Sequence, residues 1–392
     1  MSALILLEPD LPGARWAPFA GVRPVAELQA GALRIRERWE RALGFPAVAI
    51  LGEHVAGFHE LDTPPVSRTG RVSGPAIIAA SWFAPATVPI RLTPSTQRLT
   101  HRGETVAAIV PAGREVSARD ALRLGGESME IGGILLEGTF SLLGALESLL
   151  SGDCAREASA GPGDPLPEGT VMIGSAQGVL ARDAVVEPGV VFDVRQGCVV
   201  VERGAEIRSG TRIEGPCWIG AGTRVVGGFV RGSVIGARCV VRGEVSASVF
   251  LGYANKAHDG FVGHSVIGHW VNLGAGTTTS NLKNTYGPVR LDVGGERIET
   301  GRTFVGSFIG DHAKTAIGTL LATGTVIGAG ANLFGSGNTP RYVAPFAWGQ
   351  SGERLSEEGF LRVAGRVMPR REVELTAERA ASLSATYRRV TT

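Results

Sequence analysis

Lysine and asparagine are nearly missing from this chain of 392 residues. Of its 39 basic residues 36 are Arg, and only three are Lys. The three Lys and all six Asn lie between residues 255 and 338, and the first 254 residues contain neither type. A chain with this bias keeps Lys and Asn where Arg, Asp or Ser will not serve, so the composition indicates a functional site in that window.

Cysteine is also scarce, and the charge is balanced. The four Cys show no Cys-x-x-Cys spacing, which favours reduced thiols in a cytoplasmic protein over a disulfide frame or a zinc site; Cys217 and Cys239 are expected to be small packing residues. A net charge of +2 with interspersed signs argues against a nucleic-acid partner. The five-residue apolar run at the start is too short for a secretory signal. Residues 315–340 are uncharged, but their Gly, Thr and six-residue period argue against a membrane span.

Residues 1–157 have the pattern of an α/β domain. Short apolar runs at residues 3–7, 47–51, 76–80 and 106–110 predict buried strands. Residues 24–43 predict a helix between the first two strands, and strand–helix–strand predicts a parallel sheet. A further helix at about residues 140–150 precedes a linker at residues 158–170, which is rich in Gly, Pro and Ser.

From residue 171 to 348, aliphatic residues recur every six positions, with an offset around residues 193–197. Six residues form one side of a triangular prism, and three sides give an 18-residue coil that stacks on the next at about 4.8 Å. This period predicts a hexapeptide-repeat parallel β-helix. Residues 280–303 break the pattern and are expected to leave the prism, with a hairpin at Gly294 and Gly295, to cover a cleft or contact another subunit. Residues 349–392 predict two helices, at 355–367 and 376–389, that cap the prism or pack on a neighbouring subunit.

The segment from Tyr253 to Lys283, YANKAHDGFVGHSVIGHWVNLGAGTTTSNLK, holds three of the seven His residues. It resembles the acetyltransferase domain of the bifunctional enzymes that make UDP-N-acetylglucosamine from glucosamine 1-phosphate. The matching motifs are His258-Asp-Gly-Phe261-Val-Gly, Asn272-Leu-Gly-Ala-Gly-Thr, Ser280-Asn281, Val305-Gly-Ser307 and Ile327-Gly-Ala329-Gly. A variant group of these proteins is more similar still, through RPVAELQAGALRIRERWE from Arg23 and the segment from Gly252 to Thr277, so the resemblance covers nearly the whole chain.

The resemblance implies a left-handed β-helix, a nucleotidyltransferase-like domain with a Rossmann-like sheet, and a homotrimer whose active-site cleft lies between subunits. It also implies a role for each matched residue. His258 is the expected general base, because an imidazole suits proton removal from the sugar amine as it attacks acetyl-CoA. The other expected contacts are Asn272 and Asn281 to the sugar, Lys256 and Lys283 to its phosphate, and Ser307 and the Ala329 backbone to acetyl-CoA. Phe261 stands where the family has Tyr, so one hydroxyl contact is missing.

The first domain departs further from the family, which uses a Gly-rich loop, a Lys and acidic Mg²⁺ ligands to transfer a uridylyl group from UTP. Glu8-Pro-Asp10 follows the first strand here, and no Lys precedes residue 256. Arg23, Arg36 and Arg38 are the candidates for nucleotide phosphates; the alternative is a solvated helix face. The sequence therefore predicts an amino-sugar-phosphate acetyltransferase fused to a nucleotidyltransferase-like domain. The alternative function is a non-catalytic sugar-nucleotide-binding or scaffold protein.

Some His and Asn residues in this window have purely structural explanations. His264 and His269 have the spacing of zinc ligands in carbonic anhydrases built on the same helix, but Gly228 replaces the third His, so we expect both to be structural. Asn332 and Asn338 have the alternative role of satisfying left-handed corners of the solenoid.

Overall fold

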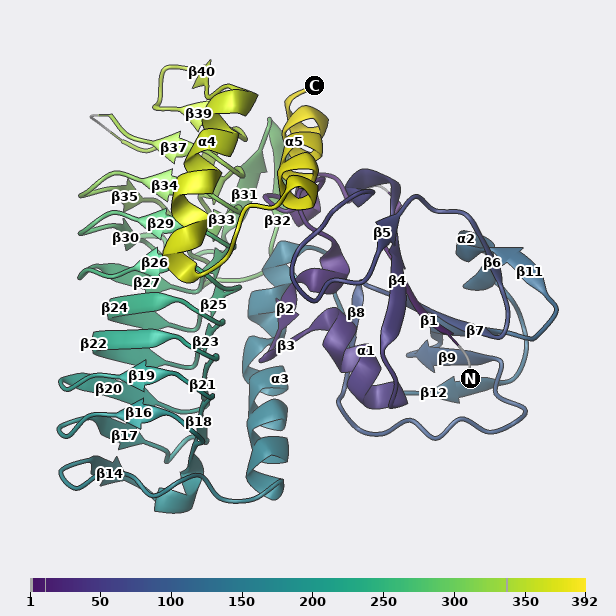
Figure 1. The fold of residues 1–392 in the computed structure, drawn as a ribbon, viewed down its shortest axis with the longest axis horizontal. Coiled ribbons are helices and arrows are strands. Elements are labelled where there is room, and N and C mark those ends of the chain that lie inside the picture. The colour runs from purple at the N-terminus through teal and green to yellow at the C-terminus, as the bar shows by residue number, and fades with distance from the viewer. Residues whose placement is uncertain (1–2, 11, 336–337) are drawn as a thin grey trace.

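The computed structural model describes residues 3–10, 12–335 and 338–392. An α/β domain lies beside a tall β-helix, the long helix α3 (Thr139–Ser159) runs between them, and the C-terminal helices lie near the upper coils (Figure 1). Among the described residues, no helix combines the length and apolar character that a membrane crossing needs.

The first domain is built on a seven-stranded sheet in the order β12-β9-β10-β7-β1-β4-β5. The strands β1, β4, β5 and β7 run parallel, whereas β10 runs antiparallel to β7 and β9. The bounds in this sheet are β1 Ala3–Leu7, β4 Ala47–Leu51, β5 Val66–Ser67, β7 Ala76–Ala80, β9 Arg98–His101, β10 Glu104–Val110 and β12 Ser128–Glu130. Three small pairs surround it: β2 Gln29–Ala30 with β3 Leu33–Arg34, β6 Arg71–Ser73 with β11 Glu115–Ser117, and β8 Phe83–Pro85 with β13 Gly133–Leu135.

The four predicted strands of this domain are confirmed, but the predicted helix at residues 24–43 is wrong in its first half. A 3₁₀ turn, Val25–Glu27, and the β2–β3 hairpin precede α1, which spans Ile35–Leu43. The hairpin turns at Gly31, which has φ +69, and a Cβ there would lie 2.5 Å from Nη2 of Arg38. Gly31 therefore supplies both the left-handed turn and the space for a buried ion pair. The domain also contains the four-residue helix α2, Ala118–Ala121.

The six-residue period is confirmed as a parallel β-helix with two long sheets. The first contains β14 Val171–Ile173, β17 Val191–Asp193, β20 Thr211–Glu214, β22 Arg224–Arg231, β24 Val240–Ser246, β26 Asn255–Lys256, β29 Asn272–Leu273, β34 Lys314–Thr315, β37 Asn332–Leu333, β39 Ala347–Trp348 and β40 Glu353–Arg354, with β16 Val185–Val186, β19 Glu206–Ile207 and β27 Phe261–Gly263 attached. The second contains β15 Val179–Ala181, β18 Val199–Val201, β21 Cys217–Ile219, β23 Val234–Ile235, β25 Val249–Phe250, β28 Val266–Ile267, β33 Phe308–Ile309, β36 Val326–Ile327 and β38 Tyr342–Val343. The short pair β30 Thr278–Thr279 and β35 Leu320–Leu321 continues the third side.

The predicted excursion leaves the prism where expected and folds into the hairpin of β31, Arg290–Val293, and β32, Glu296–Glu299, turning at Gly294 and Gly295. Its apolar residues Val289, Leu291 and Ile298 are buried in the core that joins the two domains. The excursion therefore packs within its own chain.

Two separate cores stabilise the β-helix. The inward residues of each coil, with Cys217 and Cys239 among them, fill the prism. Outward residues of the second sheet, such as Trp218 and Val249, join Leu146 and Leu149 of α3 in the interdomain core. Burial of so many apolar side chains against the prism fixes the first domain to one side of it.

The two predicted C-terminal helices are confirmed as α4, Glu357–Val367, and α5, Ala377–Thr391. They pack on their own chain. Phe360 of α4 contacts His312 of the prism, while Arg389 of α5 donates to the carbonyls of Gly21 and Ala56 in the first domain. The tail thus braces the side of the upper coils against the first domain.

Candidate functional site

Three coils of the prism repeat one pattern, an aromatic residue followed two positions later by Asn or Lys. The pattern reads Tyr253-Ala-Asn255, Trp270-Val-Asn272 and His312-Ala-Lys314. In the strand register Asn255 lies opposite Asn272, which lies opposite Lys314. The preceding rings stack with centroids 4.3 Å and 6.0 Å apart. These stacks are named here the amide column (Asn255, Asn272, Lys314) and the aromatic column (Tyr253, Trp270, His312).

The aromatic column occupies left-handed corners, with φ of 56, 62 and 61° at Tyr253, Trp270 and His312. Such φ values are uncommon for large residues and are kept where the surroundings hold them. Asn332 lies in strand β37 and donates from Nδ2 at 3.2 Å to the carbonyl of Gly330, which has φ +65, so its amide bonds a left-handed corner as its alternative role expects. Burial lowers the pKa of His312 to about 3, which keeps this imidazole neutral.

Lys256 lies inside the prism. Its register partner in the preceding coil is Val241, so it occupies a position that aliphatic residues fill elsewhere, and it is 2 % exposed. Its Nζ donates to the carbonyls of Arg242 at 2.6 Å and His258 at 3.0 Å. Burial lowers its pKa to about 8. This placement argues against the expected contact to the sugar phosphate, because the buried ammonium bonds backbone carbonyls at the corner that carries His258.

His258 itself is exposed at the corner between β26 and β27. Its side chain makes no hydrogen bond with the described residues, although its carbonyl is held by Lys256. The adjoining Asp259 pairs with Arg242 at 3.2 Å, and its carbonyl accepts from the Gly276 amide. The corner backbone is therefore fixed while the imidazole stays free, as a general base requires.

Asn281 lies at the next corner and contacts a second histidine. Its Nδ2 donates to Nδ1 of His264 at 2.9 Å, which leaves the ring proton on Nε2. Burial, with Arg302 and Arg231 nearby, lowers the pKa of His264 to about 4. Lys283 at the start of the excursion donates from Nζ to the Pro288 carbonyl at 2.6 Å. The structure thus places Asn281 and Lys283 near the excursion.

The two residues expected to line an acetyl-CoA channel are buried by their own chain. Ser307 is 0 % exposed and belongs to a column of Ser residues in which each amide bonds the hydroxyl below, Ser248 to Ser233, Ser265 to Ser248 and Ser307 to Ser265. Ala329 is 3 % exposed and lies in a small cavity lined by Phe58, Phe360 and Ser382. The cofactor-lining roles are therefore corrected, since residues of the first domain and tail cover Ala329 and the prism itself buries Ser307.

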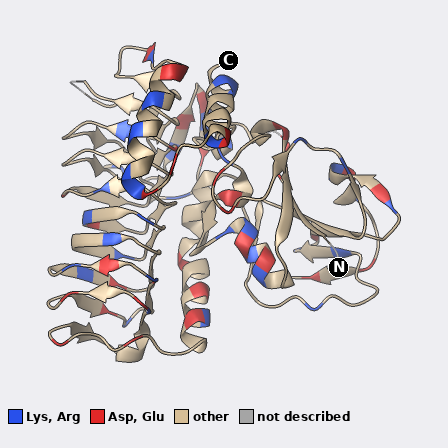
Figure 2. Ribbon diagram, in the orientation of Figure 1, with Lys and Arg blue, Asp and Glu red and all other residues tan. Residues whose placement is uncertain are grey.

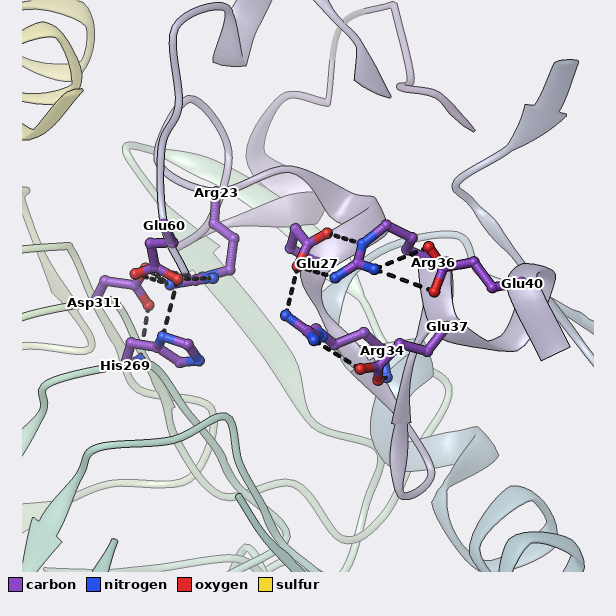
Figure 3. A network of polar contacts seen from close by, with 9 residues as sticks. All are labelled: Arg23, Glu27, Arg34, Arg36, Glu37, Glu40, Glu60, His269 and Asp311. Carbon is purple, nitrogen blue, oxygen red and sulfur yellow. Dashed lines mark hydrogen bonds and ion pairs between the residues drawn. The ribbon is translucent and has the colours of Figure 1, made fainter. Parts of the chain in front are cut away.

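The three Arg residues proposed for nucleotide phosphates form internal ion pairs (Figure 3). Arg23 bonds both Glu60 oxygens at 2.8 Å and Asp311 of the β-helix at 2.9 Å. Arg36 bonds Glu27 and Glu40, and Arg38, outside the figure, bonds Asp153 and the Ala30 carbonyl. All three are buried. They are neither free for phosphates nor on a solvated face, so both explanations are corrected: their role here is to join structural elements.

His269 belongs to the same network, with Nδ1 3.1 Å from Glu60 and its amide donating to Asp311 at 2.9 Å. Burial would raise the pKa of Glu60, but Arg23 and His269 hold it well below its ordinary value. Among the described residues no group of three His, Cys, Asp or Glu side chains is arranged to hold a metal ion.

The carboxyl edge of the parallel strands, where α/β sheets commonly bind ligands, is filled by the chain itself. Glu8, directly after β1, is 0 % exposed and accepts from the amides of Val25 at 2.7 Å and Ala26 at 3.0 Å. Ser81, directly after β7, is also buried, and its hydroxyl has no hydrogen-bond partner in the described part of the chain. The Glu8 carboxylate thus accepts from the first two amides of the 3₁₀ turn Val25–Glu27.

Comparisons with known proteins agree with this architecture. Residues 4–155 match the family described as sugar nucleotidyl transferase. A bifunctional sugar-1-phosphate nucleotidylyltransferase/acetyltransferase of Sulfurisphaera tokodaii is 39 % identical over 150 residues, 36 % of each chain. Proteins described as bifunctional protein GlmU are 35 % identical in Jannaschia sp. over 165 residues (41 % of this chain, 31 % of the relative) and 35 % in Methanococcus vannielii over 86 residues (22 % and 20 %).

The matched segments cover about a third or less of each relative's length. The family match covers the first domain, and the hexapeptide coils after it supply the second half of the architecture. Residues 4–155 thus match the sugar nucleotidyl transferase family, a parallel β-helix follows them, and the chain is similar over part of its length to bifunctional nucleotidylyltransferase/acetyltransferases.

Proposed function

We propose that the β-helix transfers an acetyl group from acetyl-CoA to the amine of glucosamine 1-phosphate or a similar amino-sugar phosphate, for nucleotide-sugar synthesis. The observation that carries the proposal is the exposed, unbonded imidazole of His258 on a corner fixed by the buried Lys256. The amine nitrogen attacks the thioester carbonyl, the carbon–sulfur bond breaks, and His258 takes the amine proton and returns it to the leaving thiolate. The similarity to bifunctional acetyltransferases supports this chemistry.

Three further residues are assigned to the acceptor. Asn281 and Asn272 hold sugar hydroxyls and orient the amine, and Lys283 pairs with the phosphate. Lys283 is only half-buried, and among the described residues its ammonium bonds the Pro288 carbonyl alone, so its other two protons are available. We assign Lys256 instead as a positioning residue for His258.

We also propose that a homotrimer completes the cleft. Ile317 and Leu320, on the side of the prism that continues above the His258 coil, are 79 % and 69 % exposed. Leu320 pairs in register with Thr278, whose hydroxyl accepts from the Phe261 amide in the His258 coil. An exposed apolar strip next to the proposed base favours a subunit contact there.

The test of acetyl transfer is thiol release. The full chain is incubated with acetyl-CoA and glucosamine 1-phosphate, and free coenzyme A is followed with a thiol reagent, alongside light scattering for the assembly state. Release that depends on the amino sugar is expected. Absence of release with glucosamine 1-phosphate, galactosamine 1-phosphate and glucosamine 6-phosphate would contradict the proposal.

Replacing Lys256 with Met tests the positioning role. Met fits an inward aliphatic position, so a melting temperature within a few degrees of wild type is expected. The two carbonyls lose their donor and the His258 corner loosens, so kcat for thiol release should fall about tenfold while KM for the sugar phosphate changes little. A rise in KM with unchanged kcat would instead assign Lys256 to the phosphate.

For the first domain we propose sugar-1-phosphate nucleotidyl transfer, with UTP and Mg²⁺ as the nucleotide and metal. The support is the family match over residues 4–155. Pyrophosphate release from UTP, N-acetylglucosamine 1-phosphate and Mg²⁺ is the measurement. The second candidate, a domain that keeps the fold without this chemistry, is favoured by the internal ion pairs of Arg23, Arg36 and Arg38 and by the buried Glu8, and it predicts no release with any of the four common nucleoside triphosphates.

A further inference from the structure

The amide column forms one wall of a cavity of about 260 Å³ whose other wall is the end of α4 and the turn that follows it. Figure 2 shows basic residues at this end of α4, beside the coils. The lining combines residues of the aromatic and amide columns, the intervening Val271 and residues of the C-terminal tail. They are Tyr253, Asn255, Trp270, Val271, Asn272, Lys314, Val367, Arg370 and Arg371. Residues from three coils and the distant C-terminus therefore meet in one place.

The charges that line this cavity have one sign. Lys314, Arg370 and Arg371 contribute three cations, and its described lining contains no Asp or Glu. A neighbouring cavity of about 490 Å³ shares Arg370 and Arg371 and adds Arg224 and Arg238. Its one carboxylate, Glu372, already pairs with Arg238 at 2.6 Å. Such a concentration of uncompensated cations in a groove attracts an anion.

The hydrogen bonds along the wall leave donors rather than acceptors. Arg371 Nη2 donates to Asn255 Oδ1 at 3.2 Å, and Asn255 Nδ2 donates to Asn272 Oδ1 at 2.8 Å. Both amide oxygens are thus used, and Nδ2 of Asn272 has no acceptor among the described residues. Lys314 gives one proton to the His312 carbonyl at 2.9 Å and keeps two, while the buried Nε of Arg371 has no partner.

The lowered pKa values of two of these cations agree with a cavity that lacks a neighbouring negative charge. Burial lowers the pKa of Lys314 to about 8, and no carboxylate opposes that change. Burial, together with Arg224 and Arg370, lowers the pKa of Arg371. A bound anion would relieve both by supplying charge and acceptors.

We propose that the cavity binds a phosphate group, and that with its neighbour it accommodates two linked phosphates of a phosphorylated small molecule. Arg forks and the half-buried Lys314 ammonium match phosphate oxygens, and the Asn272 amide adds a neutral donor. The diphosphate has two sources, inorganic pyrophosphate or the diphosphate of a nucleotide such as coenzyme A or UDP-N-acetylglucosamine. The cations of this site, Lys314, Arg370 and Arg371, have no part in the proposed acetyl transfer, whereas Asn272 is shared by the two proposals.

The test is calorimetric titration of the full chain, in phosphate-free buffer at low salt, with pyrophosphate, coenzyme A, UDP-N-acetylglucosamine and inorganic phosphate. Saturable binding of at least one diphosphate is expected, weaker for inorganic phosphate. Arg370→Ala with Arg371→Ala should lower the affinity at least tenfold. The matched control is Arg366→Ala, which removes an exposed charge from the last turn of α4, outside the cavity, and should leave binding unchanged.

Asn272→Asp is the second variant, because it adds a carboxylate to the wall without removing a tail contact, and it should also weaken binding at least tenfold. The tightest of the diphosphate probes identifies the source. Binding that is unchanged in both variants, or no saturable binding of any probe, would overturn the proposal. His258→Ala should bind as wild type does, so that failure of acetyl transfer and failure of this site are seen separately.

Discussion

His258→Ala is expected to lower kcat for amino-sugar-dependent thiol release by about 10²- to 10⁴-fold, the range over which a positioned general base contributes. The side chain is exposed and makes no hydrogen bond with the described residues, so its removal costs little folding free energy. The melting temperature should therefore match that of wild type while activity is lost. The assay is the same thiol release, run at saturating sugar phosphate so that kcat is observed directly.

The control is His59→Ala, which removes another exposed imidazole, in the first domain, and should leave kcat unchanged. Undiminished release by His258→Ala would move the base elsewhere. His264 would be the next histidine to examine, although its low pKa makes it a weak base.

The β-helix was predictable because its rule is local. Each inward aliphatic residue recurs after six positions, and the short excursion announced its hairpin through two adjacent Gly residues. The helix at residues 24–43 failed for the opposite reason. The turn at Gly31 exists to admit the contact of Arg38 with Asp153, and a partner 115 residues away leaves no local signature.

The scarcity of Lys and Asn marked residues that gather on successive coils, but it did not assign their roles. Four of these nine residues, Asn255, Asn272, Lys314 and Asn332, stack in register on successive coils. The repeated aromatic-x-Asn/Lys pattern was a signal in the sequence that could have found the cavity wall. Lys256 shares its register with Val241, so the period itself marked it as inward. The burial of Ala329 could not be foreseen, since it depends on Phe58 and on helices that follow much later.

Arg23→Met is expected to lower the free energy of unfolding by about 3–5 kcal/mol, since it leaves Glu60 and Asp311 without their partner. The guanidinium is 1 % exposed and joins the first domain to the β-helix. The measurement is the shift of the urea unfolding midpoint at pH 7. Arg290→Ala is the control, because its pair with Glu299 is exposed and should change stability by less than about 1 kcal/mol. If Arg23 served a nucleotide phosphate instead, UTP affinity would fall while stability held.

Arg38→Met tests the loss of a buried ion-pair partner in a second place, through the pH dependence of the free energy of unfolding. Burial raises the pKa of Asp153, so once Arg38 is gone this carboxylate can take up a proton as the pH falls, which relieves the unpaired charge. The destabilisation of Arg38→Met relative to wild type should accordingly be larger at pH 8 than at pH 5. In Arg23→Met, His269 still faces Glu60 at 3.1 Å, whereas both carboxylates lose the guanidinium. Adding Glu60→Gln and Asp311→Asn to Arg23→Met removes the orphaned charges and should restore most of the lost stability at pH 8. If the triple variant were no more stable than Arg23→Met, packing of the Arg23 side chain, rather than its charge, would hold the two domains together.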